Sequence, residues 1–273
     1  MLQLVAPNKL DQFPDLLRQV IPVWHATDPT WDVVALSEGI RLDLAGWTGA
    51  TFYSPDDMVA SFRSGTRISE VQQTLGTQGQ FLPLGEMPLG DPDPDLATAI
   101  GFALPHTLEG PYGSWREWIL GMTVMLGDGT IAKSGAKVVK SVAGYDAHKL
   151  FVGARGTLGV ILEVTLRVWP CAEQVRNSAR PTEATGRPWI QRTLRTDFES
   201  AIESNQGAIV ALDEATATLW GRGDPPKRFP SDWLLQGKPG ELEFTADEIP
   251  FLQKAKRLLD PDGKLNPGGL GIF

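Results

Sequence analysis

The chain has 273 residues, a formal net charge of −8 and a pI near 5.0, with the composition of an ordinary globular protein. The acidic balance argues against nucleic acid or an anionic membrane surface as the main partner, since either would need a basic face. The length allows one large domain or two small ones.

Cysteine and histidine usage excludes several kinds of site. Cys171 is the single cysteine, so the chain forms no internal disulfide and no cysteine-type metal cluster, and a reducing cytoplasm is the expected compartment. His25, His106 and His148 lie far apart in sequence, so no metal site is predicted. The segment Met1–Phe13 lacks the features of a secretory signal, and no apolar run is long enough to predict a membrane span.

The first part of the chain predicts short helices and strands. Apolar residues recur on one side of Pro7–Val20, which predicts an amphipathic helix. A second helix is predicted over Glu70–Leu75, with Ser69 as its N-cap. A turn is predicted at Ser54–Asp57. Strands are predicted over Pro22–Ala26, Trp31–Leu36, Arg41–Leu44, Ala50–Tyr53 and Met58–Arg63.

The middle of the chain alternates loops with apolar elements. Gly85–Asp95 is rich in Gly, Pro and Asp and predicts a loop, and the apolar stretch Leu96–Leu104 predicts the start of a buried helix. A second loop is predicted over His106–Ser114. The Asp-Gly pair within Gly127–Gly129 predicts a hairpin turn. Its strands are predicted over Thr123–Leu126 and Thr130–Ala132.

The central feature of the sequence is a glycine stretch. A short helix-like segment, Ala147–Val152, precedes Gly153, Gly156 and Gly159, and the β-branched run Val160–Val168 follows them. The order helix, glycines, strand disfavours a nicotinamide-type Rossmann motif, in which the glycines follow a strand. Two interpretations remain open, namely a loop shaped around a ligand and a tight turn between two elements.

The composition and the pattern of predicted elements change after Pro170. The polar segment Cys171–Pro188 predicts a linker, and Thr193–Ser204 predicts a helix. A further helix is predicted over Glu248–Leu259, with Thr245 as its N-cap. Strands are predicted over Ala208–Leu212, Thr216–Trp220, Leu234–Gln236 and Glu241–Phe244. The whole pattern predicts an α+β protein.

Several motifs carry a family resemblance. The runs Lys140–Asp146, Leu150–Gly153 and Gly156–Val160 resemble the FAD-binding domain of the vanillyl-alcohol oxidase superfamily (PCMH type), and in particular the smaller flavin subunits of bacterial glycolate oxidases. Further runs resemble the same domain in the same order: Pro55–Asp57, Ser64–Thr66, Phe81–Pro83, Tyr112–Ser114 with Arg116, Leu120-Gly121 and Leu259–Gly268. The resemblance covers about residues 8–170 and 245–270.

The resemblance implies a two-lobed FAD-binding domain with a reduced α/β cap. It implies an FAD-binding domain over residues 1–170, a cap over 171–244, and a C-terminal helix and tail, 245–273, packing back on the first domain. Non-covalent FAD is the implied cofactor, its pyrophosphate held by main-chain N–H groups of two loops. The implied cofactor-binding residues are Ala97, Thr98, Gly113, Ser114, Gly144, Gly153, Gly156, Thr157, Leu158, Gly159 and Val160.

Both phosphate loops depart from the family pattern. His25–Thr30 holds no glycine, Asp28 would repel a pyrophosphate, and Pro29 removes a donor. In the second loop Asp95 stands where the family has a hydroxyl, and both glycines are gone. These departures favour a second hypothesis, a degenerate FAD-fold subunit with weak or no FAD and a structural or regulatory role. A third hypothesis is an unrelated α+β binding protein.

The function implied by the resemblance is that of an FAD-binding subunit in a glycolate (2-hydroxy acid) oxidase or dehydrogenase complex. Its expected partners are a larger flavin subunit and an iron–sulfur subunit, and the complex would place it in the cytoplasm, peripheral to the inner membrane through those partners. No catalytic residue is predicted. His106 could face the flavin, although a lone loop histidine is more often structural. Tyr145 and Asp146 are expected to fix a turn. Arg116 and Arg155 could pair with a phosphate or with carboxylates, and a surface ion pair is the more ordinary expectation.

Overall fold

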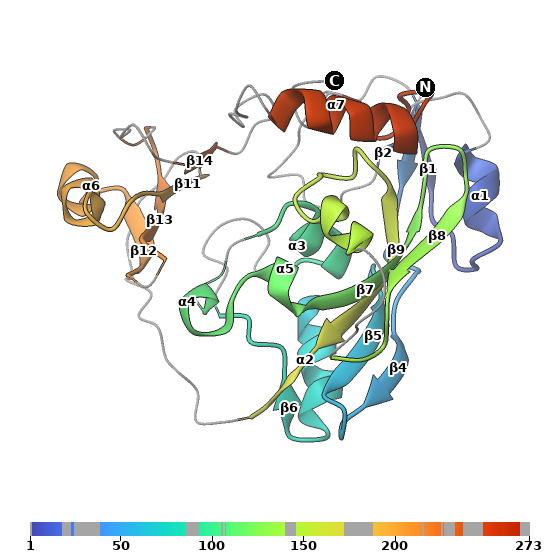
Figure 1. The fold of residues 1–273 in the computed structure, drawn as a ribbon, viewed down its shortest axis with the longest axis horizontal. Helices are drawn as coiled ribbons and strands as arrows, with labels where there is room; N and C mark the ends of the chain where they lie inside the picture. The colour runs from blue at the N-terminus through green and yellow to red at the C-terminus, as the bar shows by residue number, and fades with distance from the viewer. Residues whose placement is uncertain are drawn as a thin grey trace.

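The computed structural model describes residues 2–17, 23–24, 39–85, 93–104, 106, 108–139, 146–171, 188–214, 216–224, 226, 233–236 and 248–267. Helices and strands are mixed, as the α+β prediction requires. Figure 1 shows a small parallel sheet at one end, a larger antiparallel sheet in the middle and a separate sheet at the other end.

The small sheet has three parallel strands in the order β1-β3-β2. They are β1 (Leu2–Val5), β3 (Gly39–Leu42) and β2 (Val23–Trp24). Helix α1 (Gln12–Leu17) lies beside it and buries Phe13 completely against the ring of Trp47. The predicted helix over residues 7–20 therefore begins at Gln12, and residues 18–20 lie outside the described part. The predicted strand over residues 31–36 also lies outside it.

The central sheet has five antiparallel strands in the order β4-β5-β9-β7-β8. Most of these strands match the predicted runs, and Asp128 forms the turn of the predicted hairpin by accepting from the N–H and hydroxyl of Thr130. The strands are β4 (Ala50–Ser54), β5 (Val59–Arg63), β7 (Ile119–Met125), β8 (Ile131–Gly135) and β9 (Val160–Arg167).

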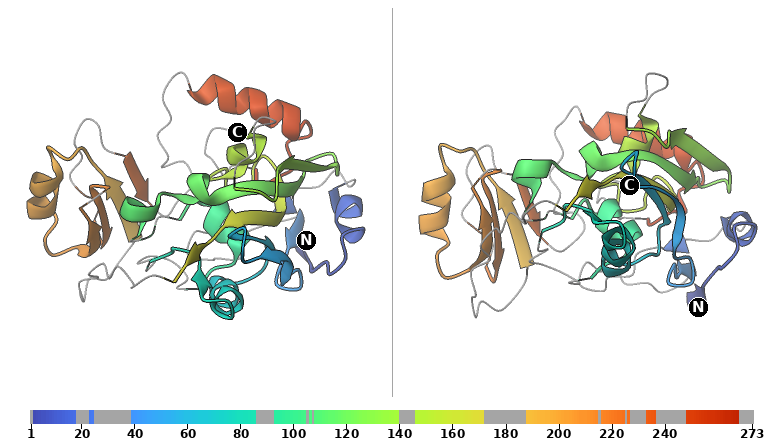
Figure 2. Two further views of the ribbon diagram at one scale, coloured as in Figure 1. Left: turned by 60° about the horizontal axis from the view of Figure 1, so that its bottom comes forward. Right: turned by 90° about the horizontal axis from the view of Figure 1, so that it is seen from below.

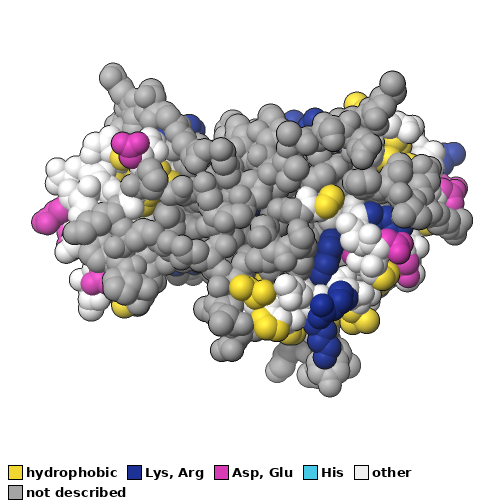
Figure 3. Space-filling view, turned by 90° about the horizontal axis from the view of Figure 1, so that it is seen from above, with side chains coloured by type: hydrophobic (Ala, Val, Ile, Leu, Met, Phe, Trp, Pro, Cys, Tyr) yellow, Lys and Arg dark blue, Asp and Glu magenta, His cyan; other side chains and the backbone are white. Residues whose placement is uncertain are grey.

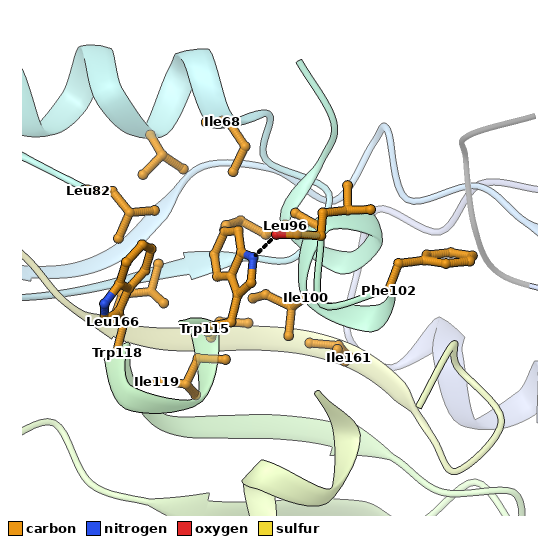
Figure 4. Close-up of a cluster of buried hydrophobic side chains, with 14 of the residues drawn as sticks. Ile68, Leu82, Leu96, Ile100, Phe102, Trp115, Trp118, Ile119, Ile161 and Leu166 are labelled. Atoms are coloured by element: carbon orange, nitrogen blue, oxygen red, sulfur yellow. Dashed lines mark hydrogen bonds between the residues drawn. The ribbon is translucent and has the colours of Figure 1, made fainter. Parts of the chain in front are cut away.

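One face of this sheet carries the main hydrophobic core. Helices α2 (Ile68–Gly76) and α3 (Leu96–Gly101) pack on it together with α5 (Trp115–Trp118). Trp115 and Trp118 are at most 1% exposed, and the indole N–H of Trp115 donates to the carbonyl of Leu104 over 2.9 Å (Figure 4). Since large buried aromatics cost about 3–5 kcal/mol when truncated to Ala, these two anchor the domain.

The first turn of α2 corrects one prediction. Ser69 lies inside the helix, and Arg67 occupies the N-cap position without a side-chain hydrogen bond. The N–H and hydroxyl of Ser69 both donate to the carboxylate of Asp93. Ser69 therefore makes a long-range contact with Asp93 and does not act as a local helix cap. An isolated antiparallel β-bridge joins Arg67, at the N-cap position, to Asp95.

The remaining sheet has four antiparallel strands in the order β12-β13-β11-β14. It contains β11 (Pro188–Arg192), β12 (Ile209–Asp213), β13 (Thr218–Arg222) and β14 (Trp233–Gln236). Helix α6 (Phe198–Ser204) covers the face that Figures 1 and 2 show turned away from the rest of the molecule. The helix predicted over residues 193–204 begins at Phe198, five residues after its predicted start. The predicted strand over 241–244 and Thr245 lie outside the described part.

The C-terminal helix α7 (Glu248–Leu259) has the predicted bounds and lies across the top of the central sheet (Figure 1). Its inward side holds Lys256 and Leu259. Shorter elements complete the fold: α4 (Glu109–Tyr112), the 3-10 helix η2 (Ala147–Phe151), and the pair β6 (Gln80–Phe81) and β10 (Trp169–Pro170). The predicted loop over residues 106–114 thus contains a helical turn, α4.

Candidate functional site

The glycine stretch forms a tightly held loop at the end of α3. Gly153, Arg155 and Gly156 have φ of +76°, +48° and +68°. The N–H of Gly153 donates to the carbonyl of Ile100 over 3.0 Å, and that of Arg155 to the carbonyl of Gly101 over 2.7 Å. Positive φ is free for glycine but strained for arginine, so contacts with α3 hold the loop in this shape.

The end of the loop combines tight packing with open donors. A Cβ on Gly159 would lie 2.7 Å from the ring of Phe151 and 3.1 Å from the carbonyl of Met125, so only glycine fits there. Both donors of Thr157 are used inside the protein, since its N–H and hydroxyl both donate to the carbonyl of Ala154. The N–H groups of Leu158 and Gly159 donate to no acceptor within the described part of the chain. Packing explains the glycine, while the open amides remain available to a ligand.

The buried Lys256 ties this loop to the end of the chain. Its Nζ donates to the carbonyl of Thr157 over 2.7 Å, to the carbonyl of Leu265 over 2.8 Å and to the Asp260 carboxylate over 2.6 Å. Burial lowers the pKa of Lys256, and the hydrogen bond that Lys256 donates to Asp260 opposes that shift. Asn266 adds a bond from Nδ2 to the carbonyl of Arg155. We call these contacts of Lys256 and Asn266 the Lys256 clamp. The sequence did not predict them, and its one signal for them is a lysine on the inward side of α7.

The N-terminus of α3 is the second predicted phosphate loop, and its donors are already used. Asp95 is 7% exposed and caps the helix, accepting from the N–H of Thr98 over 2.7 Å. The N–H of Leu96 donates to the carbonyl of Thr66, and that of Ala97 to the carbonyl of Ser64. The expected contacts from Ala97 and Thr98 to a cofactor therefore have no open main-chain donor in this arrangement.

Gly113 and Ser114 join α4 to α5. Gly113 has φ +85°, and its N–H donates to the carbonyl of Glu109 over 2.8 Å. The N–H and hydroxyl of Ser114 both donate to the carboxylate of Glu117. Burial acts to raise the pKa of Glu117, but the bonds from Ser114 outweigh it and lower that pKa. Ser114 would have to leave Glu117 before it could contact a cofactor.

His106 lies at the meeting point of the central domain and the four-stranded sheet. It is fully buried, and its ring packs on Trp118 with centroids 4.8 Å apart. Burial, helped by the positive charge of Arg192, lowers the pKa of His106 to about 3, so the ring is neutral at pH 7. Arg192 forms an ion pair with Glu109 over 2.6 Å, a long-range contact that no local pattern predicts.

The other histidine of the described residues has a structural role. His148 is buried, its Nε2 lies 3.2 Å from the carbonyl of Ile119, and its Nδ1 lies 3.2 Å from the hydroxyl of Ser134. These contacts fix η2 against β7 and β8, directly before the glycine loop. Asp146, at the N-terminus of η2, pairs with Lys149 over 2.8 Å. Arg116 donates to the carbonyl of Lys149, and the guanidinium of Arg155 lies over the ring of Phe102.

Several predicted site residues lie outside the described part of the chain. They are Gly144 and Tyr145 before η2, and His25, Asp28 and Pro29 in the first predicted phosphate loop. The fit of the described residues to FAD is therefore divided. The loop from Gly153 to Val160 offers open amides, whereas the N-terminus of α3 does not.

Comparison with known proteins identifies the class. Residues 18–135 match the model of the FAD binding domain family. The whole chain also superposes on solved alkyldihydroxyacetonephosphate synthase, with a TM-score of 0.52 at 10% identity, covering 97% of this chain and 52% of that one. Residues 18–135 therefore form an FAD-binding domain of the PCMH type, for which FAD is the cofactor. The expected fold is confirmed.

Curated relatives make the assignment more specific. The chain is 32% identical to glycolate oxidase subunit GlcE of Escherichia coli (strain K12) over 136 residues, 48% of this chain and 37% of that one. It is 30% identical to glycolate oxidase subunit GlcD of Bacillus subtilis (strain 168) over 214 residues, 76% of this chain and 38% of that one. It is 42% identical to a mitochondrial D-lactate dehydrogenase [cytochrome] of Saccharomyces cerevisiae (strain ATCC 204508 / S288c) over 134 residues, 45% and 23% of the two chains.

The chain is thus homologous to glycolate oxidase subunits and to FAD-dependent 2-hydroxy acid oxidoreductases, and it spans less than two fifths of the length of each of these curated relatives. Among the described residues, no group of His, Cys, Asp and Glu is placed to hold a metal ion. A search of the same residues finds no helix with the length and apolar character needed to cross a membrane.

Proposed function

We propose that this chain is the FAD-binding subunit of a complex that oxidises glycolate or a related 2-hydroxy acid. The observation that carries the proposal is the homology to glycolate oxidase subunits and D-lactate dehydrogenases across the FAD-binding domain. When bound, the flavin supplies a two-electron acceptor for the C–H bond of the hydroxy acid. The protein supplies binding, orientation and exclusion of water.

The residues proposed to hold the cofactor lie mainly in the glycine loop. The open N–H groups of Leu158 and Gly159 are suited to an anionic or carbonyl oxygen of FAD. Lys256 and Asn266 hold the carbonyls of Thr157 and Arg155, and so keep those amides in place. The proposed set is completed by Gly153, Gly156 and Val160 of the same loop and by the more distant Gly113, Ser114, Ala97, Thr98 and Gly144.

A partner chain is part of the proposal. The described residues contain one cysteine, Cys171, so an iron–sulfur centre would have to sit on another subunit. The outward side of α7 suits such a contact, because Phe251 and Leu258 are 58% and 77% exposed beside Lys254 and Arg257. Figure 3, seen from this side, shows apolar and basic side chains next to each other. In a chain of net charge −8 this pattern favours an apolar partner surface edged by carboxylates, which we assign to the larger flavin subunit.

A second candidate function is favoured by the N-terminus of α3. Asp95 caps the helix and the following amides donate inside the protein, so one predicted phosphate loop offers no open donor. A subunit in which FAD binding is weakened, and which acts structurally in the complex, would account for this. The two candidates differ in how tightly FAD is retained.

The deciding experiment is the visible absorption spectrum of the purified chain before and after incubation with excess FAD and desalting. Retained flavin bands, together with reduction of an artificial acceptor by glycolate or D-lactate, would support the first function. A colourless protein after desalting would support the second. Coexpression with the candidate partner would then test assembly, and Leu258→Asp should abolish coelution while leaving the spectrum of the chain unchanged.

A further inference from the structure

The buried His106 has a polar atom that no group in the described part of the chain contacts by a hydrogen bond. Its Nδ1 accepts a hydrogen bond from the N–H of Leu108 over 3.2 Å, which places the ring proton of the neutral imidazole on Nε2. That Nε2 is buried and has no hydrogen-bond partner among the described residues. A buried donor without an acceptor is destabilising, so such an atom needs an explanation, and a bound ligand is one.

A strand of the four-stranded sheet brings a cation to the same place. In the register of β11 and β13, Ile190 pairs with Trp220 and Arg192 with Thr218. Side chains alternate along a strand, so Ile190, Arg192, Thr218 and Trp220 lie on one face. Ile190 and Trp220 belong to the same core cluster as Trp118, so this face is turned toward the FAD-binding domain.

The guanidinium of Arg192 is held on two of its three nitrogens. Its Nε donates to the hydroxyl of Thr218 over 3.0 Å, and its Nη2 donates to Glu109 over 2.6 Å. The Nη1 group makes no hydrogen bond within the described part of the chain. The Arg192 side chain is 41% exposed. Glu109 follows His106 by one turn, since its N–H donates to the carbonyl of His106 over 3.3 Å, which places the guanidinium near the imidazole.

Trp220 adds another open donor on this face. Trp220 is 1% exposed, and its indole N–H has no hydrogen-bond partner in the part of the chain that the structure describes. The Nε2 group of His106, the Nη1 group of Arg192 and the indole N–H of Trp220 are all donors without an acceptor in the described part of the chain, and one of them carries a positive charge. A set made only of donors suits an anion, and the planar guanidinium edge suits a carboxylate.

We propose that this junction binds the carboxylate of the 2-hydroxy acid, with His106, Arg192 and Trp220 as its donors. The inference rests on the proposed function for the identity of the substrate. Glu109 and Thr218 act as positioning residues, since each fixes the guanidinium from one side. His106 binds the carboxylate and does not act as a base, because its Nδ1 lone pair is already used by the N–H of Leu108.

The test is an isothermal titration calorimetry experiment in which oxalate is added to the purified full-length chain. Oxalate is a two-carbon dicarboxylate that cannot be oxidised as a 2-hydroxy acid. Arg192→Met should weaken oxalate binding by roughly 10-fold to 100-fold, the range of one or two hydrogen bonds to a charged group. Trp220→Phe removes the indole N–H together with part of the buried ring system, and should weaken binding by about 5-fold to 10-fold. Arg195→Met is the matched control, an exposed arginine three residues away whose Nη2 donates to the carbonyl of Glu214, and should bind oxalate as the wild type does.

Failure of this inference is distinguishable from failure of the proposed function. If the chain lacks flavin or turns over no 2-hydroxy acid, yet Arg192→Met and Trp220→Phe lose oxalate binding while Arg195→Met keeps it, the carboxylate site stands and the proposed function fails. If glycolate is oxidised but both junction variants bind oxalate like the wild type, the junction is not the site. A wild-type chain that binds no oxalate at millimolar concentration also overturns it. Circular dichroism of each variant verifies folding, and Trp220→Phe decides the question should Arg192→Met fail to fold.

Discussion

Replacement of Lys256 by Met tests whether the clamp described above stabilises the glycine loop. All three protons of the ammonium are used, on the carbonyls of Thr157 and Leu265 and on the carboxylate of Asp260. Met keeps the length of the stem but removes the charge. Asp260, which is 1% exposed, is then left as a buried carboxylate without its cation, and two carbonyls lose a donor.

The magnitude follows from this loss. Removing one partner of a buried ion pair costs about 3–5 kcal/mol, against a total free energy of unfolding of about 5–15 kcal/mol for a typical domain. Lys256→Met should lose that amount. Asp260 still accepts from the N–H groups of Lys264 and Leu265, so the added change Asp260→Asn should restore about 1–2 kcal/mol by removing the unpaired charge.

The assay is urea unfolding followed by the fluorescence of the nine tryptophans. Lys254→Met, an exposed lysine on the same helix, is the control and should change the free energy of unfolding by less than about 0.5 kcal/mol. Retention of FAD after desalting should fall in Lys256→Met and stay constant in the control. A Lys256→Met chain as stable as the wild type, or a control that loses as much, would refute the reasoning.

Three further outcomes are expected. A Cβ on Gly65 would lie 1.8 Å from the carbonyl oxygen of Leu44, a main-chain atom, so Gly65→Ala should cost about 3 kcal/mol or more in urea unfolding, whereas Gly76→Ala, with open space around it, should not destabilise the chain. Asp95→Ala should cost about 1 kcal/mol by loss of the α3 cap, whereas Asp95→Asn keeps a cap, removes a charge and should raise the fraction of FAD retained; equal retention in Asp95→Asn and the wild type would argue against repulsion at this loop. The pKa of His106 is about 3 in the folded chain and about 6.5 in an unfolded one, so the unfolded chain binds more protons between these values and the free energy of unfolding should fall as pH drops through the window, by up to about 1.4 kcal/mol per pH unit. His106→Gln should remove that part of the slope in unfolding measured at pH 6.5 and 4.5, and an unchanged slope would mean that the imidazole is not held neutral.

The sequence by itself determined the elements whose signals are local. The Asp-Gly turn, the β-branched run of β9 and the helix α7 lie where they were predicted. The order of short motifs from Pro55 to Gly268 indicated the FAD-binding domain, which the family match confirms. Each of these features depends on neighbours within a few residues, or on a linear order of motifs.

Tertiary structure decided what the polar residues do. Ser69 is an N-cap by local rules, but Asp93 takes both its donors. Asp95 reads as a charge facing a phosphate, and the fold makes it a helix cap. Lys256 reads as a surface lysine of an amphipathic helix until Thr157 and Leu265, from elsewhere in the chain, arrive as acceptors.

The proposed carboxylate site is the clearest case. His106 and Arg192 are 86 positions apart by their residue numbers, and no pattern in either segment links them. Hydrogen bonds and ion pairs act between groups a few ångströms apart, so their partners exist only after sheet register and domain packing bring distant segments together. Periodicity and turn chemistry act along the chain, which is why the sequence could predict the elements but not the contacts between them.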